Sequence, residues 1–149
     1  MNKIYRVKSG SIELAVETFG KGLPLIYAHG LLCNRDYSRN RLMPLADKYK
    51  IIIYDAQGHR DSTPVTDPAL YNADKMAGDT GVILDALNIE QAIVGGESMG
   101  AATALLFALK WPKRVLTLLL TGPAVSDKPN IEAEQFAMLA NVIANKGMD

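Results

Sequence analysis

The sequence predicts an α/β protein: a mostly parallel sheet with helices on both faces, entered through an N-terminal antiparallel hairpin. From about residue 23 onwards, short apolar runs typical of buried strands alternate with amphipathic helical segments. The first twenty residues instead alternate apolar and polar side chains around Ser9-Gly10, as the strands of a hairpin do. Since parallel strands need crossover connections, the later alternation indicates right-handed β-α-β units.

The hydrophobic pattern places each element along the chain. The expected strands are 3–8 and 12–18 in the hairpin, followed by 23–28, 50–54, 91–95 and 115–120. The expected helices are 36–49, 72–87 and 99–110. Pro44 should kink the first helix, Asn72 is a candidate N-cap for the second, and Trp111-Pro112 ends the third.

Composition excludes several classes of partner. Sixteen basic residues balance sixteen acidic ones, and the densest basic stretch, 35–41, contains Asp36 and is expected to be a solvated helix start. We therefore expect no nucleic-acid partner. No apolar run approaches the roughly 20 residues that cross a bilayer, so we expect a soluble, cytoplasmic chain without a membrane partner.

Cysteine and histidine are scarce. The single cysteine, Cys33, excludes an intramolecular disulfide and is expected to be a small core residue rather than a nucleophile. The histidines are His29 and His59, and no metal-ligand spacing is present. We expect neither a metal nor a cofactor.

The pattern with the clearest chemistry is Gly96-Glu97-Ser98-Met99-Gly100, which lies between a predicted strand and a predicted helix. A sharp turn at this point strains the serine and brings neighbouring backbones together, so Gly96 and Gly100 are needed at the flanks. The turn also places Ser98 at a helix N-terminus, where free N–H groups and the helix dipole favour an oxyanion.

Other motifs accompany this one in order along the chain. His29-Gly30-Leu31-Leu32 follows the third strand, an Asp-x-x-Gly loop begins at Asp55 after the fourth, and the passage 111–115 follows the third helix. Together with the serine motif, they resemble the α/β-hydrolase fold family from residue 20 to about residue 124. The resemblance implies a serine hydrolase whose N-terminal half is present here.

The resemblance also implies roles for individual residues. Ser98 is the nucleophile, and the backbone N–H groups of Leu31 and Met99 form the oxyanion hole. His29 organises its loop and is not the catalytic base. Residues expected at the binding site are His29, Gly30, Leu32 and Glu97, where Glu97 either lines the pocket or only caps the turn.

The loop after the fourth strand departs from the family's Asp-x-Arg-Gly-x-Gly-x-Ser pattern. Gln57 stands in place of the arginine, and Arg60 stands in place of a glycine. His59, in the same loop, is expected to be solvent-facing or structural rather than a substitute base.

A serine hydroxyl needs a base, and in this fold the order along the chain is serine, acid, histidine. No histidine follows Ser98, and Asp127 is a weak candidate acid. We therefore expect a truncated chain that ends after the sixth strand, with 1–128 as the N-terminal part of the hydrolase core and 129–149 as the first helix of a cap or lid. The leucine-rich sixth strand would then be an open edge prone to self-association.

The leading hypothesis is a serine hydrolase that cleaves an ester, lactone or related small-molecule acyl substrate through an acyl-enzyme at Ser98. Hydrolysis of carbon–carbon bonds and perhydrolysis stay open, whereas dehalogenase and epoxide-hydrolase chemistry would require an aspartate at this position. The alternative is a catalytically inactive binding or interaction protein with the same fold. A nucleotide-binding domain is disfavoured because His29-Gly30-Leu31-Leu32 replaces a Gly-x-Gly-x-x-Gly motif.

Overall fold

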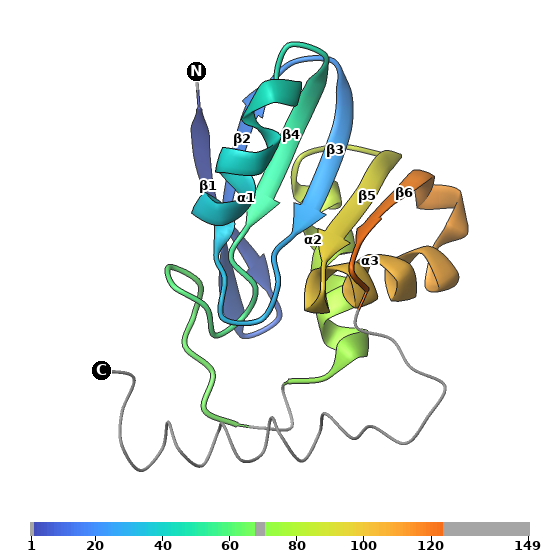
Figure 1. Cartoon of the computed structure of the whole chain (residues 1–149). Helices are drawn as coiled ribbons and strands as arrows, with labels where there is room; N and C mark the ends of the chain where they lie inside the picture. Colours follow the sequence, from blue (N-terminus) through green and yellow to red (C-terminus); the bar gives the residue numbers. More distant parts are fainter. Residues whose placement is uncertain (1, 68–70, 124–149) are drawn as a thin grey trace.

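The computed structural model describes residues 2–67 and 71–123, which form a six-stranded sheet flanked by three α-helices (Figure 1). The strand order is β1-β2-β4-β3-β5-β6. β1 pairs with β2 and β2 with β4 in antiparallel fashion, and the other three pairings are parallel. The strands are β1 Lys3–Ser9, β2 Ile12–Gly20, β3 Leu23–Ala28, β4 Tyr49–Tyr54, β5 Ala92–Glu97 and β6 Val115–Thr121. The predicted mostly parallel sheet with its N-terminal hairpin is confirmed.

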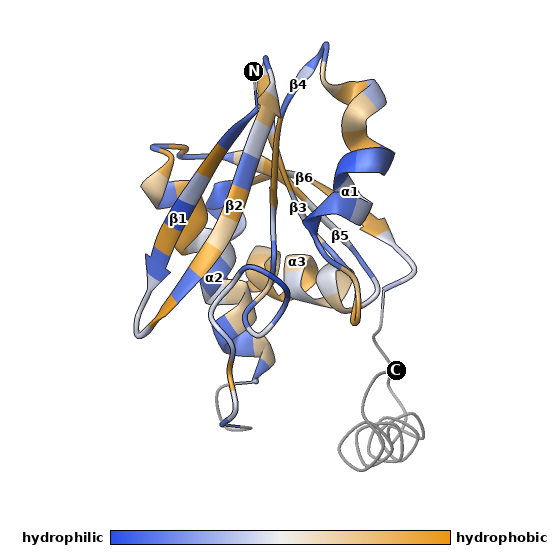
Figure 2. Cartoon of the chain, turned by 90° about the vertical axis from the view of Figure 1, so that its left-hand side faces the viewer, coloured by the Kyte–Doolittle hydropathy of each residue, from blue (hydrophilic) through white to orange (hydrophobic). Residues whose placement is uncertain are grey.

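The helices cover both faces of this sheet, as predicted. They are α1 (Arg35–Leu42), α2 (Ala73–Ala86) and α3 (Met99–Lys110). Alternate strand residues point to opposite sides, so Ile26 and Ile52 pack with α2 and α3 while Leu25 and Ile51 pack with α1. The two sides differ in polarity, since α1 is mostly hydrophilic and α3 mostly hydrophobic (Figure 2).

The helix predicted at 36–49 is the largest error in the sequence-based assignment. α1 ends at Leu42, and a 3₁₀ turn, Met43–Leu45, follows it. Pro44 has no N–H to donate to the preceding turn, and its ring clashes with the carbonyl four residues earlier, so the α-helix ends here instead of bending. The expectation of a solvated helix start is also wrong, because the first residue, Arg35, is buried.

The remaining elements match their predicted bounds to within two residues. Asn72 caps α2, and its side chain accepts a hydrogen bond of 2.8 Å from the N–H of Lys75. Leu116, Leu118 and Leu119 of β6 are exposed, and β6 lies at one edge of the sheet as far as the structure describes it. The self-association expected at this edge stays a prediction. Asp127 and the helix expected at 129–149 lie outside the described residues.

Within residues 2–67 and 71–123, none of the helices has the length and apolar character needed to cross a bilayer. The cytoplasmic location expected from the sequence stays a prediction.

Asp79 is a carboxyl group buried between α2 and the hairpin. Its side chain accepts a hydrogen bond of 2.6 Å from the Ser9 hydroxyl. Burial raises the pKa of Asp79, while the Ser9 hydroxyl and the charge of Lys75 act in the opposite direction. The folded chain therefore holds this proton more tightly than the unfolded chain. The free energy of unfolding should fall as the pH rises from the ordinary carboxyl range through the raised pKa.

Replacing Asp79 with asparagine keeps an acceptor for the Ser9 hydroxyl but removes the buried charge. We expect Asp79→Asn to raise the free energy of unfolding at pH 7 and to flatten its pH dependence, measured by urea unfolding from about pH 4 to pH 8. Ser9→Ala is the matched control. It removes a group that lowers the pKa of Asp79, so its stability should fall further with rising pH. A pH profile of Asp79→Asn parallel to wild type would refute this account.

Candidate active site

The turn at residues 96–100 joins the end of β5 to the start of α3. Ser98 lies in this turn with φ 52° and ψ −113°, a positive-φ conformation that L-residues rarely adopt. Two backbone hydrogen bonds hold it there. The Ser98 N–H donates to the carbonyl of Thr121 at 3.0 Å, and the Ser98 carbonyl accepts from the N–H of Ala102 at 3.1 Å. The serine is thus fixed at the N-terminus of α3.

The two glycines of the turn allow three backbone segments to touch. A Cβ on Gly96 would lie 2.2 Å from the carbonyl carbon and oxygen of Gly100. A Cβ on Gly100 would lie 2.2 Å from the carbonyl oxygen of Ala28, at the end of β3. Both distances are far below van der Waals contact, so neither position accepts a larger residue without backbone movement. The first turn of α3 consequently packs against the end of β3.

The loop at 29–34 lies against this turn. A Cβ on Gly30 would be 3.5 Å from the Cβ of Ser98, an ordinary contact distance. Within the loop, the N–H of Cys33 donates to the carbonyl of Gly30 at 3.1 Å, and Leu32 has a positive φ of 61°. The tight turn leaves the Leu32 side chain exposed. The structure therefore brings the two glycine-containing motifs of the sequence together.

His29 orients this loop with both of its ring nitrogens. Nε2 lies 3.0 Å from the backbone N–H of Ala56, and Nδ1 lies 2.7 Å from the carbonyl oxygen of Gly30. Because Ala56 is a donor, Nε2 must accept and Nδ1 carries the proton. Burial lowers the pKa of His29, which keeps the ring neutral at pH 7. Since neither nitrogen is available to take a proton from a serine, the geometry suits the loop-organising role implied by the resemblance.

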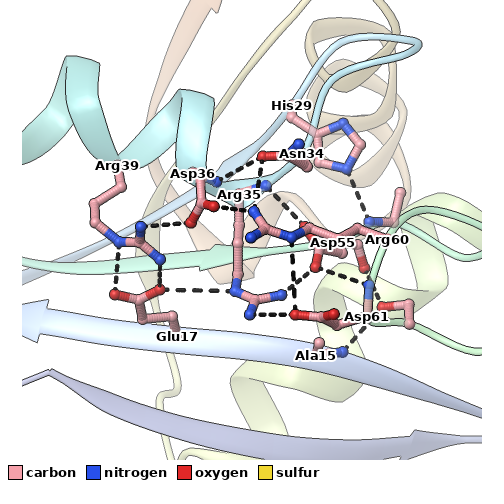
Figure 3. A network of polar contacts seen from close by, with 12 residues as sticks. Ala15, Glu17, His29, Asn34, Arg35, Asp36, Arg39, Asp55, Arg60 and Asp61 are labelled. Atoms are coloured by element: carbon pink, nitrogen blue, oxygen red, sulfur yellow. Dashed lines mark hydrogen bonds and ion pairs between the residues drawn. The ribbon is translucent and has the colours of Figure 1, made fainter.

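A network of charged side chains beneath the 29–34 loop fixes the loop after β4 (Figure 3). Arg35 is at its centre. The backbone N–H of Arg35 donates to Asp55 at 2.8 Å, and its guanidinium pairs with both Asp55 and Asp61, the latter at 2.6 Å. Asp55 is completely buried. The pKa of Asp61 is lowered, chiefly because Arg35 donates to it.

The network extends along α1 to β2. Arg39 donates to the buried carboxylate of Glu17 and also pairs with Asp36, which in turn pairs with Arg60 (Figure 3). The hydrogen bond from Arg60 lowers the pKa of Asp36. Arg60 occupies the position where the family pattern has glycine, and it still has the positive φ, 40°, that favours glycine.

Sequence reasoning missed this network. One signal was available, because Arg35 and Arg39 are four residues apart and so share a face of a helix. That face meets Glu17, a buried acidic residue whose neighbours in β2, Val16 and Thr18, are uncharged. The positive charges of three arginines in this network thus offset all but one of the negative charges of its four carboxylates. Within the basic stretch, Arg35 and Arg39 thus pair with buried carboxylates, whereas Arg41 remains exposed.

Glu97 is the last residue of β5 and directly precedes Ser98. Its carboxylate pairs with Arg41 of α1 at 2.7 Å, and the guanidinium of Arg41 lies 5.5 Å from the ring centroid of Tyr37. Whether Glu97 lines the pocket or only caps the turn, the two placements left open by the sequence, stays a prediction. Glu97 thus links the 96–100 turn to the helix on the opposite face of the sheet.

Among the described residues, two cavities of substantial volume adjoin the 29–34 loop, beside a third of only about 10 Å³ at His29. The first has a volume of about 220 Å³ and is lined by Ser98, Leu31 and Met99 together with residues of α2 and α3. The second, of about 580 Å³, shares Leu31 but not Ser98, and its lining includes His59 and Cys33. The ring of His59 lies edge-on to His29 at 4.8 Å, and its Nδ1 is 3.0 Å from the carbonyl of Gln57. The first cavity is therefore the one at which the predicted nucleophile and both predicted oxyanion donors meet.

No side chain within the described ranges forms a hydrogen bond with the Ser98 hydroxyl. His29 has both nitrogens engaged, and His59 lines the second cavity. Among the described residues, the site therefore holds a candidate nucleophile and two candidate N–H donors, but no base in contact with the serine.

Comparisons with known proteins agree with this geometry. Residues 24–145 match the family model described as the alpha/beta hydrolase fold. The chain is 31% identical over 143 residues to a protein of Mycobacterium phage D29 provisionally named as a non-heme haloperoxidase, covering 94% of this chain and 51% of that protein. It is 29% identical over 139 residues to 3-oxoadipate enol-lactonase 2 of Acinetobacter baylyi, covering 92% of this chain and 50% of the lactonase.

Among solved structures, the chain is similar to a thermophilic esterase from Thermogutta terrifontis, with a TM-score of 0.86 and 25% identity. That similarity covers 97% of this chain and 54% of the esterase. The chain spans about half the length of the curated relatives it matches. The family match over 24–145, the strand order and the serine turn agree: this chain belongs to the α/β-hydrolase fold family.

Proposed function

We propose that Ser98 is the nucleophile of a serine hydrolase that cleaves an ester, a lactone or a related acyl substrate through an acyl-enzyme. The observation that carries the proposal is the meeting of Ser98, Leu31 and Met99 at one cavity, with the serine strained at the N-terminus of α3. Relatives named as an enol-lactonase and an esterase support the substrate class. Position 98 holds serine rather than the aspartate nucleophile that the family's epoxide hydrolases would require.

In the proposed reaction, Ser98 Oγ attacks the acyl carbon and its proton passes to a base. The carbonyl oxygen becomes an oxyanion that accepts hydrogen bonds from the N–H groups of Leu31 and Met99. Collapse of this intermediate breaks the bond to the leaving oxygen, which takes the proton back from the base and departs as the alcohol. The ester left on Ser98 is then hydrolysed by water. Loss of one such donor typically costs about 10²- to 10³-fold in rate, so the two N–H groups would carry much of the catalysis.

A second candidate is a catalytically inactive binding or interaction protein. One observation favours it: both histidines of the sequence precede Ser98, and the described residues place neither in hydrogen-bond contact with its hydroxyl. Without a base, the serine would be a weak nucleophile and the cavity would serve binding alone.

Labelling with a fluorophosphonate separates the two candidates. We expect one phosphonyl group per chain by intact-mass spectrometry, and we expect the label to disappear in Ser98→Ala. The matched control is Ser11→Ala, which changes an exposed serine in the hairpin turn and should label like wild type. Wild type unfolded in urea should not react, since activation depends on the folded turn. A folded wild-type chain that stays unlabelled would contradict the nucleophile and favour the binding protein.

A further inference from the structure

We infer that the cavity beside Ser98 takes an apolar acyl group of about six to eight carbons. The inference rests on the proposed function, because it assigns the acyl part of the substrate to a place next to the nucleophile. Three properties of the cavity carry it: the chemistry of its lining, its size and its position relative to Ser98.

The lining is apolar. Ala73 and Met76 come from the first turn of α2, and Met99 and Ala102 from the first turn of α3. Thr103 adds a hydroxyl, but that hydroxyl donates to the carbonyl of Met99 at 3.0 Å and is thus already engaged. No charged side chain is among the described residues that line the cavity. A charged or strongly polar acyl group would therefore lose its hydration without gaining a partner.

The size of the cavity sets the length of the group. Its volume is about 220 Å³. An apolar cavity of about 150 Å³ can hold benzene, so this one has room for roughly six to eight carbons. Two alanines, Ala73 and Ala102, leave this space open, and a larger side chain at either position would fill it. The two methionines are flexible and can adapt to a straight chain.

The position of the cavity favours the acyl group over the leaving group. Ser98, Leu31 and Met99 all line it, so a group bound there starts next to both the nucleophile and the two oxyanion donors. The neighbouring cavity of about 580 Å³ touches only Leu31 of these three. Its lining combines polar side chains, Asn34, His59 and Arg60, with apolar ones such as Leu32, so it offers a leaving group polar partners that the first cavity lacks. The acyl carbon bonded to Ser98 thus has its alkyl chain directed between α2 and α3.

Neutral amides can test the cavity without any catalysis. The chain contains six methionines, so ¹³C-methyl labelling of methionine gives at most six signals. Hexanamide should shift the signals of Met76 and Met99 and leave exposed Met43 unchanged. If about half of each added methylene becomes buried, affinity rises about twofold per methylene. Hexanamide should then bind at least about tenfold more tightly than acetamide.

N-hexylacetamide carries the same alkyl chain on the leaving-group side of the amide. It should bind no better than acetamide at Met76 and Met99. Equal binding of hexanamide and N-hexylacetamide would overturn the assignment of the cavity to the acyl group.

Blocking variants provide the second test. Ala102→Phe should reduce hexanamide affinity about tenfold, back to the level of acetamide. Ala108→Phe makes the same change at another half-buried position of α3 that does not line the cavity, and it should leave affinity unchanged. Should Ala102→Phe fail to fold, Ala73→Phe blocks the cavity from an exposed position at the start of α2. Unchanged hexanamide affinity in a folded blocking variant would overturn the inference.

The two proposals fail in distinguishable ways. Labelling of Ser98 without a chain-length preference in the amide experiment would overturn the acyl-chain inference and leave the hydrolase proposal standing. A chain-length preference at Met76 in a chain that no fluorophosphonate labels would contradict the hydrolase proposal, and with it the assignment of an acyl substrate.

Discussion

Replacing Arg35 with methionine is expected to lower the free energy of unfolding by about 3–5 kcal/mol, the usual cost of removing one partner from a buried ion pair. Asp55 is completely buried, and Arg35 is its cationic partner in the network. Methionine approximates the aliphatic part of arginine but has no donors, so the carboxylate would be left without a counter-charge. Urea unfolding followed by circular dichroism measures the change.

The matched control is Arg41→Met on the same helix. Its partner Glu97 is partly exposed and Arg41 itself is solvent-accessible, so only a small change in stability is expected. Equal losses in the two variants would mean that the network stabilises the fold no more than a surface pair does. Arg35→Met should also slow the fluorophosphonate reaction, because the loop after β4 carries the Ala56 N–H that orients His29.

A methyl group at Gly100 should have a comparable effect for a steric reason. The new Cβ would lie 2.2 Å from the carbonyl oxygen of Ala28, a backbone atom that cannot move aside without shifting β3. We expect Gly100→Ala to cost about 3 kcal/mol in unfolding free energy, at the upper end for overpacking. Any folded population should lose Ser98 labelling, since α3 must move away from β3 and take the serine with it.

Gly78→Ala is the control for this substitution. Gly78 lies inside α2, and a Cβ there meets nothing within 4 Å. Alanine should therefore stabilise the chain by about 0.5–1 kcal/mol through helix propensity. If Gly100→Ala were as stable as wild type and labelled normally, the close contact between α3 and β3 would not be required for the site.

Much of the fold follows from periodicity alone. The bounds predicted for β3 and α3 are those observed, because an apolar run that ends at His29 and a helical pattern that ends at Trp111-Pro112 each have an unambiguous boundary. The serine turn could also be predicted from the sequence. Gly96 is required by a local contact with Gly100, so this part of the pattern can be recognised from neighbouring residues, whereas the contact of Gly100 with Ala28 depends on the fold.

The charged network could not be predicted from hydrophobic periodicity or local patterns. Arg35 pairs with residues 20 and 26 positions away, and Glu17 reaches Arg39 across 22 positions. Such pairings depend on how the strands are ordered in the sheet, which hydrophobic periodicity does not specify. The same holds for Glu97, whose partner Arg41 lies 56 residues earlier in the chain. The end of α1 was missed for a different reason, since a proline inside a helical pattern can either bend a helix or stop it.

The backbone conformation of Ser98 imposes a stability cost at the position of the proposed nucleophile. Its backbone, at φ 52°, is in a region that costs an L-residue about 1–3 kcal/mol, whereas glycine would bear little of that cost. A laboratory selection for thermostability alone would thus favour glycine at position 98 and remove the hydroxyl in the same step. Under the proposed function, only a selection that also requires acyl chemistry would retain the serine, so stability and activity would make opposite demands on position 98.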